Sequence, residues 1–385
     1  MRQFATRAIP KMVKHLPLNS STEIRLTRLC TQQCRQCSVY ERRTDPPSMD
    51  IASFRIIARR LRDYGAYIGF ISGGEATLVP DLDQILLEAK RTFSQATTLV
   101  TGLYNKTPII QKYATIALEN DINIQTSLDG FGDIGDYLRG AKNFSDTVLQ
   151  HMQLISQQRR NSKSLLYANI VINNLNLEQV PELIQRAVDL GWKTTIGMYH
   201  TLTETTRFDE EMKLRPGKKL DKILSFLDAN HNILNLNSYI LGINDYIKGQ
   251  ANKYCAFTDS PFLATRTTIM ENGDVHLCYG GAIGNLFHQN LIDIFSSQAY
   301  KQALKSYSKC KGCWTTCYTQ RYLLIHPRSI HELLDNIRKV LNLNRKYDIT
   351  RGIRHAETTR NQQNQEGQQL CGAKKASSTA CESER

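Results

Sequence analysis

Three cysteines, Cys30, Cys34 and Cys37, lie within eight residues near the N-terminus of the chain. Structural zinc sites and iron–sulfur centres held entirely by protein normally use four ligands, so three thiols leave one metal position open to another molecule. An iron with an open position is reactive, and the spacing therefore predicts a catalytic metal centre. Two alternatives remain open on this motif alone: three buried thiols without a metal, or half of a zinc site.

A second short motif, Gly73-Gly74-Glu75, follows the next predicted strand. Together with the C-x3-C-x2-C spacing it resembles the radical S-adenosylmethionine (SAM) superfamily. The resemblance implies that the three cysteines hold three irons of a [4Fe–4S] cluster, that SAM chelates the fourth, and that Gly73, Gly74 and Glu75 bind the amino group of SAM. It also implies reductive cleavage of SAM to a 5′-deoxyadenosyl radical, which abstracts hydrogen from an unactivated carbon. No acid–base catalytic residue is therefore assigned.

The same resemblance assigns further SAM contacts to polar residues at or after predicted strand ends. Ser127 would bind the ribose or carboxylate of SAM, Arg139 would pair with the carboxylate in bidentate geometry, and Asn169 and Asn173 would contact the ribose. The structural alternative for each is an ordinary polar residue of a loop or strand end. Gln36 stands where the family often has an aromatic residue near the adenine.

A second group of cysteines lies in the C-terminal part of the chain, at Cys255, Cys278, Cys310, Cys313 and Cys317. Its pattern resembles, in part, the SPASM or twitch domains, where G-x4-C and a later C-x2-C supply ligands for a second [4Fe–4S] cluster. We expect one auxiliary cluster on the first four of these thiols, with Cys317 spare or replacing one of them. A structural zinc on four of the five is the alternative.

The elements that must position these motifs alternate between strands and helices up to about residue 201. The predicted strands, short and rich in β-branched residues, are 22–29, 67–72, 97–102, 122–128, 165–173 and 194–199. Six βα units in series require parallel strands, and the chain here is too short for a closed eight-unit barrel. The sequence thus predicts an α/β fold, a partial (βα)6 TIM-like barrel followed by a small Cys-rich auxiliary-cluster domain. Both SAM motifs then fall at the carboxyl ends of strands, where such barrels place active sites.

Helical spacing and turn residues give the remaining elements. Apolar spacing predicts helices over 54–61 after Asp50, over 82–89 after Pro80, over 180–188 ending at Gly191, over 218–229 and after Pro327. An Asn-rich stretch after residue 229 is expected to be less regular. Asn272-Gly273 predicts a two-residue hairpin whose returning strand carries Cys278.

The predicted organisation has six parts. They are a basic amphipathic arm (1–20), the radical SAM barrel (21–205), a bridge (206–254), the iron–sulfur domain (255–325), an amphipathic helix (326–356) and a disordered tail (357–385). The arm is expected to pack over the barrel, with contact to a membrane surface as the alternative. The helix is expected to dock on the protein itself.

Composition limits the protein class. The chain of 385 residues carries a formal charge of +13, but its Lys and Arg are scattered, so a nucleic-acid partner is not expected. It shows neither a long apolar run nor a signal-peptide core, which predicts a cytoplasmic protein. That compartment is reducing, which favours metal ligation over disulfides for its ten cysteines.

Three classes of function remain. The leading prediction is a radical SAM oxidoreductase or maturase acting on a peptide or protein side chain, served by a reductant such as flavodoxin or ferredoxin. The second is a radical SAM enzyme acting on a small metabolite, sugar or lipid. The third is a non-catalytic metal-binding scaffold.

Overall fold

The computed structural model describes residues 16–37, 48–200, 209–250, 255, 257, 262, 265–278, 280–310, 312–327 and 329–344. Most of the predicted N-terminal arm and the whole predicted tail lie outside these residues. The six domain boundaries given above stay a prediction.

One nine-stranded sheet organises the described part of the chain, in the order β6-β5-β4-β3-β2-β1-β7-β8-β9. The strands are β1 (Asn19–Arg25), β2 (Ile68–Ser72), β3 (Ala96–Val100), β4 (Asn123–Ser127), β5 (Leu166–Ile172), β6 (Lys193–Met198), β7 (Thr265–Ile269), β8 (Asp274–His276) and β9 (Gly284–Asn285). Strands β1 to β6 pair in parallel, each with the next along the chain. The six predicted strands are confirmed, although β1 begins at Asn19 and ends at Arg25.

The sheet continues beyond the six-unit barrel through β1. On one side β1 pairs in parallel with β2, where Thr22 lies opposite Gly69, and on the other it pairs in parallel with β7, where Thr22 lies opposite Thr267. The antiparallel strands β8 and β9 then extend the sheet. The C-terminal unit therefore shares backbone hydrogen bonds with the first strand of the barrel.

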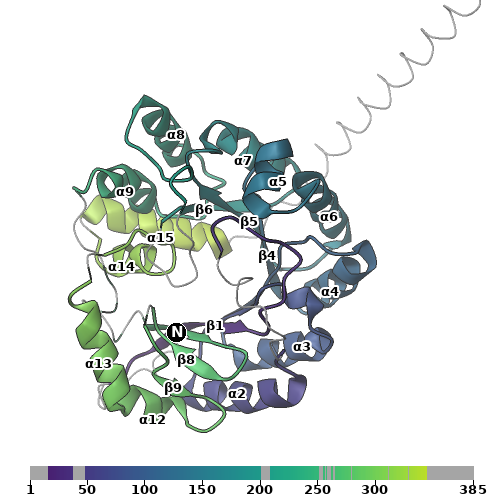
Figure 1. The fold of residues 1–385 in the computed structure, drawn as a ribbon, viewed down its shortest axis with the longest axis vertical. Coiled ribbons are helices and arrows are strands. Elements are labelled where there is room, and N and C mark those ends of the chain that lie inside the picture. Colours follow the sequence, from purple (N-terminus) through teal and green to yellow (C-terminus); the bar gives the residue numbers. More distant parts are fainter. Residues whose placement is uncertain are drawn as a thin grey trace, which may run out of the picture.

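Helices surround the curved sheet as an outer ring (Figure 1). They are α2 (Ile51–Tyr64), α3 (Leu82–Thr92), α4 (Thr107–Glu119), α5 (Gly132–Arg139), α6 (Phe144–Gln158), α7 (Val180–Asp189), α8 (Lys218–Asp228), α9 (Asn237–Ile247), α12 (Leu291–Ser296), α13 (Gln298–Tyr307), α14 (Thr319–Ile325) and α15 (Ile330–Asn344), with 3-10 turns η2 (Ala76–Leu78) and η3 (Leu177–Gln179). Asp50 caps α2 by accepting from the Ser53 amide at 2.7 Å. Gly191 follows α7 with φ of +78°, which confirms the predicted left-handed helix end.

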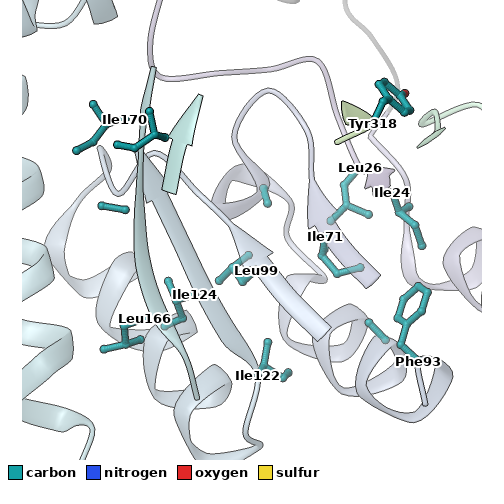
Figure 2. Packing of buried hydrophobic residues seen from close by; sticks show 14 of the residues in the cluster. Ile24, Leu26, Ile71, Phe93, Leu99, Ile122, Ile124, Leu166, Ile170 and Tyr318 are labelled. Carbon is teal, nitrogen blue, oxygen red and sulfur yellow. The ribbon is translucent and has the colours of Figure 1, made fainter. Parts of the chain in front are cut away.

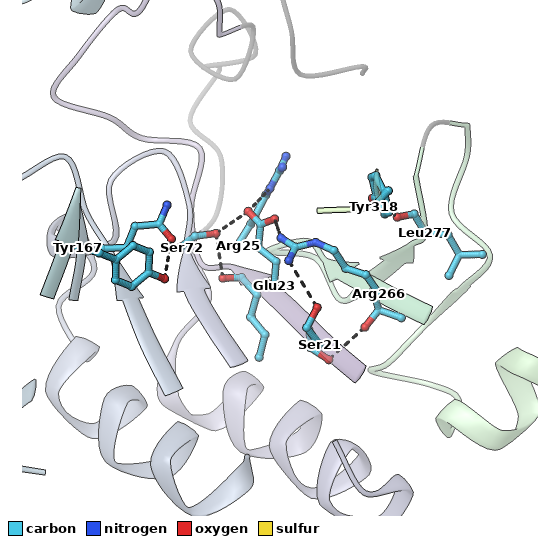
Figure 3. A network of polar contacts seen from close by, with 12 residues as sticks. Ser21, Glu23, Arg25, Ser72, Tyr167, Arg266, Leu277 and Tyr318 are labelled. Carbon is cyan, nitrogen blue, oxygen red and sulfur yellow. Dashed lines mark hydrogen bonds and ion pairs between the residues drawn. The ribbon is translucent and has the colours of Figure 1, made fainter. Parts of the chain in front are cut away.

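The two faces of the sheet differ in chemistry because side chains alternate along each strand. Ile24, Ile71 and Leu99 belong to the large apolar core, part of which Figure 2 shows. The other face of β1 carries Glu23 and Arg25, which join a polar network with residues of β2 and β7 (Figure 3). The barrel therefore has an apolar outer layer and a charged interior.

Two local expectations differ from the structure. The β7–β8 hairpin forms, but its loop spans 270–273, closed by bonds between Met270 and both Asp274 and Gly273, and Cys278 lies beyond the end of β8. The Asn-rich stretch contains a helix, α9, because Tyr239, Ile240 and Ile243 on one face are buried.

No helix within the described ranges is long and apolar enough to span a bilayer.

Candidate active site

The loop that carries Cys30, Cys34 and Cys37 starts after the carboxyl end of β1 and is anchored on the end of α5. The Gln33 amide donates to the Arg139 carbonyl at 3.2 Å, and the Arg35 amide donates to the Leu138 carbonyl at 2.9 Å. Within the loop, the Cys37 amide donates to the Cys34 carbonyl at 3.1 Å. Backbone bonds thus hold the loop at the strand ends, where the barrel prediction puts the active site.

Two glycines let other segments approach this loop closely. A Cβ on Gly140 would lie 2.4 Å from the Gln33 carbonyl oxygen, and Gly140 also has φ of +56° at the C-cap of α5. A Cβ on Gly74 would lie 2.2 Å from the Leu29 carbonyl oxygen, which accepts from the Glu75 amide at 2.7 Å. In the described structure the glycine at 74 therefore makes room for the chain leading to Cys30.

Arg139 is buried beside the second cysteine. Its Nη1 donates to Cys34 Sγ at 3.4 Å and lies 3.4 Å from Asp129 Oδ2, and its guanidinium lies 5.1 Å from the centroid of the Phe144 ring. Its Nε is buried without an acceptor among the described residues. Burial alone would lower the pKa of Arg139, but the negative charges of Cys34 and Asp129 outweigh it and raise that pKa.

Asp129 joins this group from the loop after β4, although the sequence analysis assigned it no role. It accepts from the Val171 amide at 2.7 Å and from Gln36 Nε2 at 3.4 Å. Burial raises the pKa of its carboxyl, while Arg139 acts in the opposite direction. The available signal was an acidic residue two positions beyond a predicted strand-end serine, in Thr126-Ser127-Leu128-Asp129-Gly130.

The three thiols suit an iron–sulfur cluster in their chemistry. Burial raises the pKa of Cys30 to about 12, with smaller contributions from the charges of Glu75, Cys34 and Cys37. Burial also raises the pKa of Cys34. Within the described residues no three Cys, His, Asp or Glu side chains converge closely enough to hold a metal ion. Ligation therefore has to displace protons from these buried thiols, as is general for thiolate sites.

Glu75 already receives four hydrogen bonds. Its Oε1 accepts from the Thr77 amide at 3.1 Å, the Thr77 hydroxyl at 2.8 Å and the Thr101 hydroxyl at 2.7 Å, while its Oε2 accepts from the Gly102 amide at 2.7 Å. The residue is 1% exposed. It therefore ties the loop after β2 to the loop after β3, in addition to any contact with a ligand.

The other candidate SAM contacts fall into two groups. Ser127 ends β4 directly opposite Asn169 of β5, and the Asn169 side chain accepts from the Thr195 hydroxyl at 3.0 Å. Asn173 is buried, donates to the Val171 carbonyl at 3.1 Å and accepts from the Leu175 amide at 2.9 Å. The structure brings Ser127 and Asn169 together, whereas both ends of the Asn173 amide hold its own loop.

The second cysteine group surrounds Cys313. Burial raises the pKa of Cys313 to about 12, and the negative charges of Cys255, Cys310 and Cys317 raise it further. The Cys278 amide donates to the Tyr307 hydroxyl at 3.3 Å. All five thiols are partly buried and none forms a disulfide. Which four would bind a cluster stays a prediction.

Two family models match the chain. The Radical SAM superfamily model matches residues 24–213, and the SPASM iron–sulfur cluster-binding domain model matches residues 262–315. The first domain implies a [4Fe–4S] cluster and SAM, and the second implies additional iron–sulfur clusters.

Curated relatives are distant in sequence. The chain is 20% identical over 177 residues to the sporulation killing factor maturation protein SkfB of Bacillus subtilis, covering 46% of this chain and 41% of SkfB. It is 23% identical over 217 residues to the PqqA peptide cyclase of Xanthomonas euvesicatoria, covering 54% of each. The chain thus spans about half the length of these relatives.

Solved structures share the fold. Streptococcus suis SuiB has a TM-score of 0.57 at 20% identity, covering 85% of this chain and 79% of SuiB. The enzyme anSMEcpe with bound AdoMet has a TM-score of 0.56 at 15% identity, covering 88% of this chain and 99% of that protein. From its two domain matches and this shared fold, the chain belongs to the radical SAM superfamily, with a SPASM iron–sulfur domain following its radical SAM domain.

Proposed function

We propose that this protein is a radical SAM enzyme that abstracts hydrogen from a side chain of a peptide or protein substrate. The observation that carries the proposal is the anchoring of the three-cysteine loop on α5, with Arg139 beside Cys34 and the Gly-Gly-Glu segment against the approach to Cys30. This arrangement puts the proposed cluster ligands and candidate SAM contacts at one end of the barrel.

In this proposal Cys30, Cys34 and Cys37 hold the [4Fe–4S] cluster, which supplies the electron that cleaves SAM to a 5′-deoxyadenosyl radical. Arg139 binds the SAM carboxylate, because its buried Nε has no acceptor within the described residues. Ser127 donates to the ribose or carboxylate, and Asn169 lies beside it. The backbone of Gly73 and Gly74 binds the amino group, with Glu75 fixing the loop.

The peptide substrate is supported by the similar proteins. One curated relative is a PqqA peptide cyclase, and one solved structure is SuiB bound to the precursor peptide SuiA. The charged barrel interior is also suited to a polar substrate. A sugar, lipid or other small metabolite is the competing substrate class, and a flavodoxin or ferredoxin is the proposed electron donor.

Anaerobic reconstitution tests the chemistry. We expect the full chain, given iron, sulfide, dithionite and SAM, to form 5′-deoxyadenosine, and a Cys34→Ala variant to lose this activity together with part of its iron. Cys371→Ala, outside both cysteine groups, is the matched control and should behave as the unmodified protein. A protein that binds zinc, forms no nucleoside and does not bind SAM would support the scaffold instead.

Co-expression tests the substrate class. The enzyme and its Cys34→Ala variant are each produced with short peptides encoded beside the gene, and the peptides are compared by mass spectrometry. We expect a mass change that depends on Cys34. An unmodified peptide, combined with nucleoside formation stimulated by a sugar or lipid, would move the assignment to the metabolite class.

A further inference from the structure

The barrel interior holds more buried positive charge than negative charge. Glu23 of β1 accepts from Arg25 Nε at 3.1 Å, from Arg266 Nη2 at 2.8 Å and from the Ser72 hydroxyl at 2.9 Å, as Figure 3 shows. One carboxylate therefore serves two guanidinium groups. Despite burial, the two arginines lower the pKa of Glu23 to about 2, so Glu23 is ionised at neutral pH.

A third arginine adds to this excess. Arg321 of α14 donates to the Ser20 hydroxyl, which itself donates to the Thr265 carbonyl at 2.9 Å. No carboxylate among the described residues forms an ion pair with Arg321. Burial, and then the positive charge of Arg266, lower the pKa of Arg321 to about 10. Three arginines against one glutamate leave two positive charges in excess, and burying unbalanced charge is costly.

The missing negative charge is expected at Cys317. Arg321 lies four residues after Cys317, on the helix that follows it, and the adjacent Tyr318 is fixed by its hydroxyl bond to the Leu277 carbonyl at 2.7 Å. A negative charge on Cys317 is the strongest favourable influence on both Arg266 and Arg321. A cluster core held by four thiolates is an anion of about −2, which would balance the excess.

We propose that Arg266 and Arg321 are charge partners of an auxiliary iron–sulfur cluster on the Cys317 side of the C-terminal cysteines, and that they raise its reduction potential. The inference rests on the cofactors of the proposed function. Reduction adds one negative charge to the cluster, and nearby buried positive charge stabilises the reduced form. A raised potential suits a cluster that accepts electrons rather than one that donates them.

The test is a redox titration of the full chain followed by electron paramagnetic resonance. A Cys30→Ala, Cys34→Ala, Cys37→Ala background isolates the auxiliary cluster. In this background Arg321→Gln should lower the equilibrium constant for reduction about tenfold, which is a shift of about 59 mV to lower potential for one electron. Arg321→Lys keeps the charge and should restore most of the potential. Arg338→Gln, at an exposed site on α15, is the control and should cause no shift.

A second variant predicts the opposite sign. Glu23→Gln removes the one carboxylate and should raise the potential of the same cluster. The inference is overturned if Arg321→Gln retains its iron and its potential, or if Glu23→Gln fails to raise the potential. A chain that forms 5′-deoxyadenosine but holds only one cluster would overturn this inference alone and leave the proposed function standing.

Discussion

At the scale of single residues, the site depends on ionised side chains kept in buried positions by partners from distant segments. Arg139 and Asp129 come from different loops, and their side chains are 9% and 1% exposed. Glu23 lies between arginines from β1 and β7. Removing one partner of such a group leaves a charge buried without compensation, which is far more costly than removing a surface ion pair.

Arg139→Gln should destabilise the apo protein by about 3 kcal/mol or more, because Asp129 would remain buried without its cation. Asp129→Asn keeps the shape and should relieve part of that cost in the double variant. A double-mutant cycle from urea unfolding should therefore give a coupling of about 1–3 kcal/mol. Additive effects of the two substitutions would show that the ion pair contributes nothing to folding.

Glu23 should make the free energy of unfolding depend on acid pH. Its folded pKa of about 2 lies below its ordinary value of 4.5, so its contribution is complete above pH 4.5 and is lost as pH falls from there to 2. The loss is about 3 kcal/mol in total. In urea unfolding at several pH values, Glu23→Gln should show a shallower fall than the unmodified chain. The exposed Glu210→Gln serves as the control and should follow the unmodified protein.

At the scale of elements, the cysteine loop is positioned by the backbones of its neighbours. Its amides bond to the last residues of α5, and Gly140 is the point of closest approach. Gly191 offers a matched comparison, since it too has a left-handed φ after a helix, but a Cβ added there would meet nothing within 4 Å. The two glycines separate backbone strain from collision with the loop.

Gly191→Ala should cost about 1 kcal/mol of unfolding free energy from backbone strain alone. Gly140→Ala should cost more, and it should also lower iron incorporation at the first cluster, because the added methyl group displaces Gln33. Iron content and urea unfolding of the two variants give the comparison. Equal iron content in both would mean that the loop does not depend on this contact.

The sequence predicted elements set by local pattern and missed those set by distant contacts. The six barrel strands, the Asp50 cap and the Gly191 helix end follow from β-branched runs and capping residues. The pairing of β7 with β1 joins Thr22 to Thr267, and no local signal encodes such a contact. Helix α9 was missed because its asparagines hid an apolar face that packs around Trp314.

The candidate site shows the same division. The motifs located the cysteines, Glu75 and Arg139 in the chain, since their residue types and spacing are local. The bonds of Asn173 to its own loop, and the role of Asp129 as partner of Arg139, depend on the folded path of the chain. Polar residues at strand ends look alike in sequence, whether they bind a ligand or hold a turn.

At the scale of the whole molecule, β1 joins the barrel to the C-terminal unit. It pairs with β2 on one side and β7 on the other, and Arg266 crosses that boundary to reach Glu23. The chain has two tryptophans, one in each part. Trp192 is buried between α6 and β6, and Trp314 is buried against Tyr239.

The two parts should therefore unfold together. Trp192→Phe leaves a probe in the C-terminal unit, and Trp314→Phe leaves one in the barrel. We expect the fluorescence transitions of the two variants in urea, corrected for any change in stability measured by circular dichroism, to coincide. Two separate midpoints would show that the shared strand pairing does not couple the parts.

The outer edge of β6 is closed by the chain that follows it. Thr194 exchanges backbone bonds with Asn232 and Leu234 at 3.1 and 2.8 Å, and the Asn235 side chain bonds both the amide and the carbonyl of Ile196, at 2.7 and 3.0 Å. At the opposite end of the sheet, β9 has only two residues. An open nine-stranded sheet thus presents little free backbone at either end, which protects the protein against self-association through strand pairing between molecules.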